Sequence, residues 1–410
     1  MVNKPFILGS NLVTSDLDLC DYETFMRTVA GNTGNSYISY ALIREICGRY
    51  RNVPQIKSLY AYDFSQMDRD VDVVNNECTH LCLVLQDQIR IHESYGYQLP
   101  YRNIIRFLRK VRRPIVVAGL GANLLTGYDP AFDKKLPQDL IRFLRELAGL
   151  VHAIGVRGEF TREVLAKIGV RNAVTIGCPS YFEKGPVRQV VKRGFGRLGV
   201  STGVSPNLLA NAQVYLQDCQ PVEAEIIKAL AFGRKRDFSP DVYAALVDGR
   251  MHIFSSIEDW QKSLAALDFF VGLRVHGAIC ALNSGVPAVV MNRDSRAREM
   301  CEYLGIPYLP ELSDTNKVEE IYAQADYARM NDAYAARYAA FREFMRGNGL
   351  ELAALQADEP ADRQPSLQIP GGGGGGNREG VVLTTAGHSP RYRLGKWMVK
   401  KGRRLMGLVR

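Results

Sequence analysis

The stretch "GLRVHGAICALNSGVPAVVMN", residues 272–292, decides the fold. It begins where the apolar run "DFFVGL" (268–273) ends, continues as a short helical pattern, and closes in a second apolar run, "PAVVMN" (287–292). Continuous apolar runs joined by a helix are typical of parallel strands that are covered on both faces. Arg274 and His276 stand where the strand should become a helix. A packed core has no use for a guanidinium there, whereas an anion-binding site does.

The same strand–arginine–helix–strand unit occurs earlier, in "AIGVRGEFTREVLAKIGVRNAVTI" (153–176), where Arg157 takes the place of Arg274. Ligands of open α/β sheets bind outside the carboxyl ends of the strands, where helix N-termini favour anions. Each arginine adds a forked donor that matches carboxylate or phosphate, and the imidazole of His276 can move a proton. Taken singly, each arginine also fits a surface ion pair, and the histidine fits a helix cap or a core position. The doubled pattern favours an anion site.

The chain as a whole predicts an α/β fold with two domains. Strands are expected at 55–63, 80–85, 114–121, 152–156, 173–177, 197–203, 268–273 and 287–292, with amphipathic helices between them. The basic, Gly- and Pro-containing stretch 184–196 separates the two domains. We therefore predict a first domain over 1–185 that contributes Arg157, a second over 195–346 with closing helices, a flexible Pro/Gly-rich linker over 354–390, and a basic amphipathic tail over 391–410.

The net charge of +9 belongs to the end of the chain. Residues 388–410 hold eight Lys or Arg and no acid, so the remainder carries only +1. A nearly neutral body argues against a nucleic-acid-binding protein. No apolar stretch reaches the length of a membrane span, and the N-terminus lacks a signal-peptide pattern, so we expect a cytoplasmic protein. The amphipathic tail suits the anionic inner face of a membrane, which predicts a peripheral location. A disordered, solvated tail that binds RNA or no partner is the alternative.

Two long blocks, "GVRGEFTREVLAKIGVRNAVTIGCPSYF" (155–182) and "FFVGLRVHGAICALNSGVPAVVMNRDSRAREMCEYLGIPY" (269–308), resemble the polysaccharide pyruvyl transferase family. The glycine-rich "AGNTGNSYISYALI" (30–43) resembles the family's early glycine loop. The family commonly carries an acid where this chain has Asn35. The resemblance implies two facing Rossmann-like domains of the glycosyltransferase-B type. It also implies phosphoenolpyruvate as the donor and a pyruvate ketal on a sugar as the product.

In the resemblance, Arg157 and Arg274 match arginines that hold the donor, and His276 matches the proton donor or an essential polar group. The further candidates for the space between the domains are Asn35, Asn123, Ser180, Arg296 and Glu299. We expect no metal and no cofactor, with phosphoenolpyruvate as the co-substrate. The acceptor is expected to be a saccharide, either a polysaccharide or a lipid-linked glycan precursor. A sugar-nucleotide-dependent glycosyltransferase of the same architecture, with Arg274 on a diphosphate, and a non-catalytic anion-binding scaffold remain alternatives.

Overall fold

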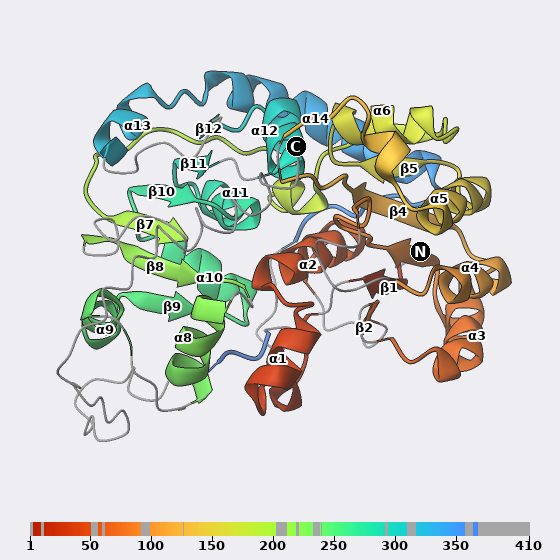
Figure 1. Cartoon of the computed structure of the whole chain (residues 1–410), viewed down its shortest axis with the longest axis horizontal. Coiled ribbons are helices and arrows are strands. Elements are labelled where there is room, and N and C mark those ends of the chain that lie inside the picture. Colours follow the sequence, from red (N-terminus) through yellow and green to blue (C-terminus); the bar gives the residue numbers. More distant parts are fainter. Residues whose placement is uncertain are drawn as a thin grey trace, which may run out of the picture.

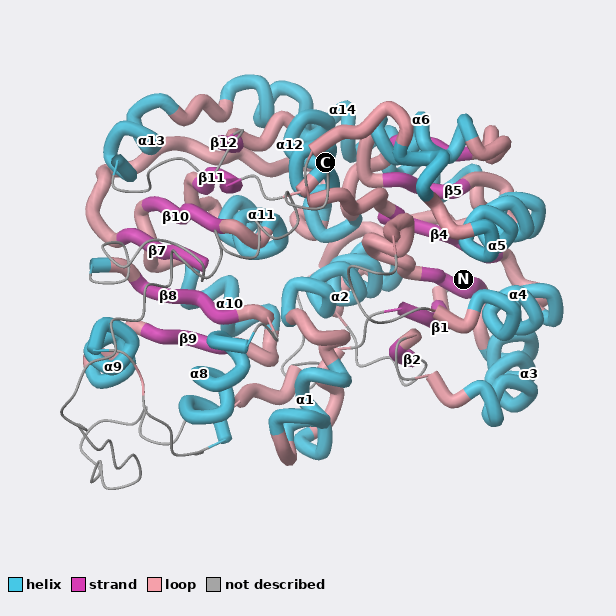
Figure 2. The backbone as a smooth tube through the Cα atoms, in the orientation of Figure 1, coloured by secondary structure: helices cyan, strands magenta, loops and turns pink. Residues whose placement is uncertain are grey.

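The computed structural model consists of two α/β domains, each built on one parallel sheet (Figure 1). The structure describes residues 3–9, 12–50, 56–59, 62–91, 99–125, 127–201, 211–218, 221–232, 238, 240–291, 294–309, 317–356 and 364–367. Every strand pair in both sheets is parallel. In Figure 2 the two sheets occupy the two halves of the molecule, and helices α2 and α11, which contact each other, lie between them.

The first sheet has the strand order β2-β1-β3-β4-β5-β6. Its strands are β1 (Pro5–Gly9), β2 (Ile56–Ser58), β3 (His80–Leu83), β4 (Ile115–Leu120), β5 (Ile154–Val156) and β6 (Ala173–Thr175). The α-helices of this domain are α1 (Tyr22–Thr28), α2 (Thr33–Cys47), α3 (Met67–Glu77), α4 (Tyr101–Lys110), α5 (Gln138–Leu150) and α6 (Glu159–Lys167). Short 3-10 helices are η1 (Asp16–Leu19), η2 (Phe64–Gln66), η4 (Phe132–Lys135) and η5 (Pro179–Phe182).

The second sheet has the strand order β12-β11-β10-β7-β8-β9. Its strands are β7 (Leu198–Ser201), β8 (Gln213–Leu216), β9 (Met251–Ile253), β10 (Phe269–Gly272), β11 (Ala288–Met291) and β12 (Tyr308–Leu309). The helices are α8 (Pro221–Phe232), α9 (Pro240–Val247), α10 (Ile257–Leu264), α11 (Val275–Asn283), α12 (Ser295–Leu304), α13 (Val318–Gln324) and α14 (Ala328–Gly347). This is the order of a dinucleotide-binding Rossmann sheet, whose direction of winding reverses between β7 and β10. Ligands of such sheets bind at that reversal, which is where α11 begins.

Over the described residues up to Gln356 the chain crosses between the domains twice, and these two crossings lie side by side. The first follows η5, and the second is α14, which starts near the second sheet and ends against the first. Asn331 of α14 donates to the carbonyl of Val190 at 2.8 Å and accepts from its N–H at 3.0 Å. At the far end of α14, the side chain of Asn348 accepts from the N–H of Ala153 at 3.2 Å. Two Rossmann-like domains with a C-terminal helix that returns to the first are the glycosyltransferase-B arrangement.

After α14 the chain stays close to both domains. The N–H of Gln356 donates to the carbonyl of Gly48 at the end of α2 (2.6 Å). Residues 364–367, which the sequence assigns to the flexible linker, contact the second domain, where Ser255 donates to the carbonyl of Pro365 at 2.9 Å. The rest of the predicted linker and the whole tail over 391–410 lie outside the described residues.

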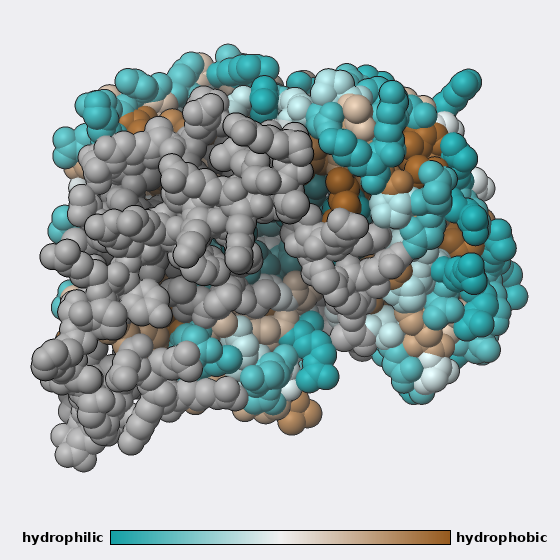
Figure 3. All heavy atoms as spheres, in the orientation of Figure 1, coloured by the Kyte–Doolittle hydropathy of each residue, from teal (hydrophilic) through white to brown (hydrophobic). Residues whose placement is uncertain are grey.

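The predicted α/β architecture is confirmed, and each of the eight expected strands is present. The sequence missed β1, β8, β9 and β12, and the expected closing helices of the second domain are α13 and α14. Among the described residues, no helix combines the length and hydrophobicity needed to cross a membrane. On the face shown in Figure 3, the described surface is mostly hydrophilic, with smaller hydrophobic patches over the first domain.

Candidate active site

Arg157 is the central residue of the site. It follows β5, where its N–H donates to the carbonyl of Leu120 at 2.9 Å. The residue is only 1% exposed, yet none of its three guanidinium nitrogens has a hydrogen-bond partner among the described residues. Burial lowers its pKa, although an arginine stays charged at any physiological pH. A buried guanidinium without partners is costly, so its retention points to an anion that binds there.

His276 lies in the first turn of α11 and is 7% exposed. Burial and the charges of Arg157 and Arg296 hold its pKa well below the usual value, which Asp87 offsets only in part. The free imidazole is therefore neutral at neutral pH. Its Nε2 lies 3.5 Å from Sγ of Cys178, which comes from the turn after β6. The first turn of α2 packs directly on the same histidine, because a Cβ on Gly34 would lie 2.7 Å from the Cβ of His276.

Asp87, Asn123 and Arg296 form a polar group beside Arg157. Asn123 donates from Nδ2 to Asp87 at 2.8 Å, and Arg296 donates to the same carboxylate oxygen at 3.2 Å. Burial raises the pKa of Asp87, but Arg296, Arg90 and Arg157 together bring it below its usual value. The Oδ1 atom of Asn123 is buried and has no partner among the described residues. The group therefore joins the end of the first sheet to helix α12 and offers one open acceptor.

Glu299 of α12 lies between the domains at the start of α6. Its carboxylate accepts from the N–H of Thr161 at 2.9 Å and from its hydroxyl at 2.7 Å. The residue is 2% exposed, and burial raises its pKa to about 8, although Thr161 and Arg157 both act to lower it. Only glycine fits at position 158, because a Cβ there would lie 2.5 Å from the Cβ of Glu299. This close approach holds α12 against the turn that carries Arg157.

Arg274 caps the N-terminus of α11 with extended backbone, as expected for the end of a strand. Its guanidinium forms an ion pair with Asp218, which follows β8. Glu223 accepts from the N–H of Asp218 at 3.0 Å, and burial together with the charge of Asp218 raises the pKa of Glu223 to about 7. The structure thus gives Arg274 a carboxylate partner, whereas the guanidinium of Arg157 has no hydrogen-bond partner in the described part of the chain. An incoming anion at Arg274 would share or displace Asp218.

The remaining candidates lie around this group. Ser180 is fully buried, and its hydroxyl lies 3.1 Å from Sγ of Cys178. Asn35 is half-buried at the start of α2 and donates to the carbonyl of Ala30 at 3.2 Å. Asp294 caps α12, as the sequence indicates, by accepting from the N–H of Ala297 at 2.9 Å. The structure therefore brings Arg157, His276, Asn123, Ser180, Arg296 and Glu299 to one region, with Arg274 at the N-cap of α11, two positions before His276.

Sequence reasoning missed four residues of this region, which are Asp87, Cys178, Gln217 and Asp218. Gln217 is 1% exposed, and neither amide atom of its side chain has a partner among the described residues. A Cβ on Gly277 would lie 2.4 Å from Nε2 of Gln217, so the side-chain amide of Gln217 packs against the first turn of α11. Asp87 follows β3 closely, and Gln217 with Asp218 follow β8. A polar residue directly after a strand is the signal that could have found Asp87, Gln217 and Asp218. The last two were missed because the preceding run "QVYL" was not recognised as a strand.

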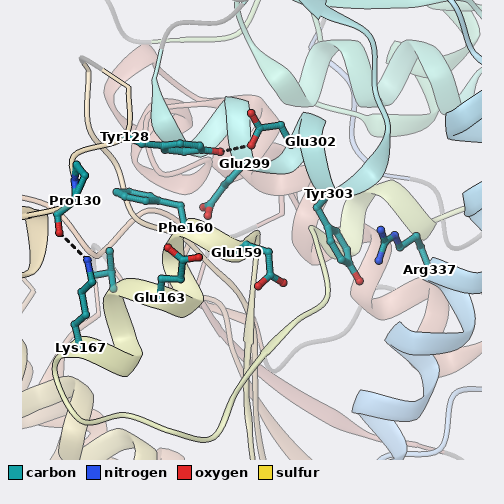
Figure 4. Close-up of a pocket in the computed structure, with 11 residues that line it drawn as sticks. Tyr128, Pro130, Glu159, Phe160, Glu163, Lys167, Glu299, Glu302, Tyr303 and Arg337 are labelled. Carbon is teal, nitrogen blue, oxygen red and sulfur yellow. Dashed lines mark hydrogen bonds between the residues drawn. The ribbon is translucent and has the colours of Figure 1, made fainter.

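A separate cavity of about 470 Å³ lies on the outer side of α6, which we call the outer pocket (Figure 4). It is lined by Tyr128, Pro130, Glu159, Phe160, Glu163, Val164, Lys167, Glu299, Glu302, Tyr303 and Arg337. The rings of Tyr128 and Phe160 stack at 4.7 Å, and the guanidinium of Arg298 covers Tyr128. These contacts occupy both faces of Tyr128. Glu299 separates the outer pocket from Arg157.

The sequence matches the model of the polysaccharide pyruvyl transferase family over residues 32–295. That span covers more than half of the chain and includes both arginine-bearing turns. The chain belongs to the polysaccharide pyruvyl transferase family. The family assignment agrees with the resemblance of the two sequence blocks and supports an enzyme of the transferase type. No curated protein matches the sequence.

Solved structures similar to this family member include a UDP complex, a UDP-N-acetylglucosamine 2-epimerase and a glycosyltransferase. S. aureus MnaA with UDP is 11% identical, with 84% of this chain and 95% of that chain covered and a TM-score of 0.39. The UDP-N-acetylglucosamine 2-epimerase from Rickettsia bellii is also 11% identical, with coverages of 85% and 96% and a TM-score of 0.43. The glycosyltransferase SnogD from Streptomyces nogalater is 12% identical, with coverages of 84% and 96% and a TM-score of 0.30. At this similarity they inform neither the site nor its substrate.

Proposed function

We propose that this protein transfers pyruvate from phosphoenolpyruvate to two hydroxyls of a saccharide, forming a cyclic ketal and releasing phosphate. The observation that carries the proposal is the guanidinium of Arg157, which is 1% exposed and has no hydrogen-bond partner among the described residues. Phosphoenolpyruvate places a carboxylate and a phosphate on one small carbon frame. Forked guanidinium donors match both groups, and charge-assisted hydrogen bonds are the strong ones. The family assignment supports the same donor.

The proposed chemistry assigns one task to each residue. Arg157 binds and neutralises the donor, and Arg274 does the same once the anion competes with Asp218. His276 delivers a proton to the methylene carbon, which makes the neighbouring carbon electrophilic. One sugar oxygen then bonds to that carbon, the bond to the phosphate oxygen breaks, and a second sugar oxygen closes the ring. Of the two protons that the hydroxyls lose, one replaces the proton given to carbon and the other leaves with phosphate.

Donor binding and proton uptake are linked in this proposal. A neutral imidazole cannot act as the acid, and His276 is kept neutral by burial and by the charges of Arg157 and Arg296, which Asp87 offsets only in part. A bound dianion offsets these charges and raises the pKa of His276, so the imidazole gains its proton as the donor binds. Loss of a general acid typically slows turnover by about 10²–10⁴-fold. We expect this range for His276→Asn.

The test is incubation of the protein with phosphoenolpyruvate and a mixture of oligosaccharides. We expect phosphate release together with an acceptor that gains the mass of one pyruvic acid less one water. Arg157→Met and His276→Asn should abolish both signals, whereas Arg298→Met, on the far side of α12, should leave them unchanged. Turnover with UDP-sugars in place of phosphoenolpyruvate would favour the glycosyltransferase alternative. A thermal shift with phosphoenolpyruvate but no turnover on any saccharide would favour an anion-binding scaffold.

A further inference from the structure

Cys178 is a buried thiol that the proposed reaction does not use. It precedes η5 and is fully buried. Its Sγ lies 3.5 Å from Nε2 of His276 and 3.1 Å from Oγ of Ser180. Both distances are within the range for hydrogen bonds that involve sulfur. The thiol therefore stands between the imidazole and a hydroxyl, although the cysteine and the histidine are 98 positions apart in the sequence.

The elements that carry these groups are fixed to each other at both ends of α11. His276 stands in the first turn of the helix, and Asn283 is its last residue. Nδ2 of Asn283 donates to the carbonyl of Ser180 at 2.8 Å and to the hydroxyl of Tyr37 at 2.6 Å. The short helix η5 is therefore held along α11. The thiol cannot leave the imidazole without breaking contacts at the other end of the helix.

A second observation ties the thiol to the ligand site. Arg157, whose guanidinium lacks hydrogen-bond partners among the described residues, lies close to the turn that holds Cys178, because a Cβ on Gly119 would lie 4.0 Å from Nε of Arg157 and 3.2 Å from Cδ of Pro179, the residue after the cysteine. After burial, the charge of Arg157 is the largest influence that lowers the pKa of His276. Cysteine, histidine and the open guanidinium therefore face one region. An anion bound to Arg157 would lie beside the imidazole that the thiol contacts.

We propose that Cys178 is a positioning residue for His276. The thiol donates to Nε2, Ser180 donates to the sulfur, and the proton of the neutral imidazole is thereby confined to Nδ1. A ring nitrogen that accepts one hydrogen bond has its tautomer and its orientation set by that bond. This inference rests on the proposed function only in assigning catalysis to His276. The contact itself can be tested without turnover.

The direct test is the tautomer of His276, measured by nitrogen-15 NMR on the ligand-free full chain. Its signal is assigned by its loss in His276→Asn. We expect the Nδ1–H form in the wild type, the same form in Cys178→Ser, and a mixture of both forms in Cys178→Ala. Cys82→Ala is the matched control, because Cys82 is equally buried but lies on β3. Equal tautomer populations in the wild type and Cys178→Ala would overturn the proposal.

Kinetics supply a second readout that loss of packing alone would not produce. Cys178→Ala should lower kcat about 10–100-fold, the usual effect of removing a group that orients a functional histidine, with KM for phosphoenolpyruvate unchanged. Cys178→Ser should restore most of the loss. An equal fall in kcat for Cys178→Ala and Cys82→Ala would contradict a specific role. If no variant and no wild-type protein turns over phosphoenolpyruvate, the proposed function fails, and the tautomer measurement alone decides on Cys178.

Discussion

Replacing Arg157 with methionine should make the ligand-free protein more stable while abolishing donor binding. Each buried hydrogen-bonding group that stays unsatisfied costs about 1–3 kcal/mol, and Arg157 has three such nitrogens. Methionine fills a similar apolar volume without that cost. Asp87 loses one nearby positive charge, which offsets part of the gain. The net effect should be about 1–3 kcal/mol, or a melting temperature higher by about 2–6 °C for a domain of this size.

Arg296→Met is the matched control, because that guanidinium has partners. It forms ion pairs with Asp87 at 3.2 Å and with Asp294 at 3.1 Å. Its removal takes an ion-pair partner from two buried carboxylates, so this variant should melt below the wild type. Melting curves with and without phosphoenolpyruvate complete the assay, since the ligand should stabilise the wild type but not Arg157→Met. A lower melting temperature for ligand-free Arg157→Met than for the wild type would refute the reasoning.

Two further predictions concern packing and pH. A Cβ at position 34 would lie 2.7 Å from His276, so Gly34→Ala should cost about 1–3 kcal/mol and displace the imidazole, with turnover falling about 10²-fold. Gly149→Ala, whose Cβ meets no atom within 4 Å, should melt at or above the wild type; equal behaviour of the two variants would argue against the contact. Burial raises the pKa of Glu299 to about 8, above its value in the unfolded chain. The native state therefore binds the extra proton, and the stability that this group contributes falls as the pH rises from about 5 to 8. Glu299→Gln should flatten the melting temperature over that range, and an unchanged slope would count against the raised pKa.

The sequence carries most of the fold because the signal is local. Each βα unit shows an apolar run, a polar turn and a helical period within some twenty-five residues, and both arginine-bearing units appear where expected. Length does not explain which strands escaped notice, because β5 and β6 have three residues and were expected, whereas β1 has five and was not. The missed strands β8 (QVYL) and β9 (MHI) each include a polar residue, which weakens their apolar signal. They are recognised as strands once neighbouring strands pair with them.

In the candidate site, too, local sequence predicts some residues and leaves out the contacts between distant ones. Arg157, Arg274 and His276 stand at strand ends, so the pattern of one segment suffices to select them. The contact of Cys178 with His276 and that of Asp87 with Arg296 join residues 98 and 209 positions apart. Nothing in either local segment indicates its partner. The pairing of Arg274 with Asp218 depends in the same way on β8 and β10 flanking β7 in the sheet.

The two backbone connections between the domains limit how the domains can move relative to each other. Arg188 of the first passage lies between the rings of Tyr181 and Tyr334, with its guanidinium 4.0 and 4.2 Å from the two centroids, so that passage is clamped to α14. The two connections are therefore fastened to each other, and residues 364–367, which return to the second domain, add a further contact between the halves. Any change in the angle between the two sheets has to carry both connections together, because separating them would break the contacts of Arg188 with Tyr334 and of Val190 with Asn331.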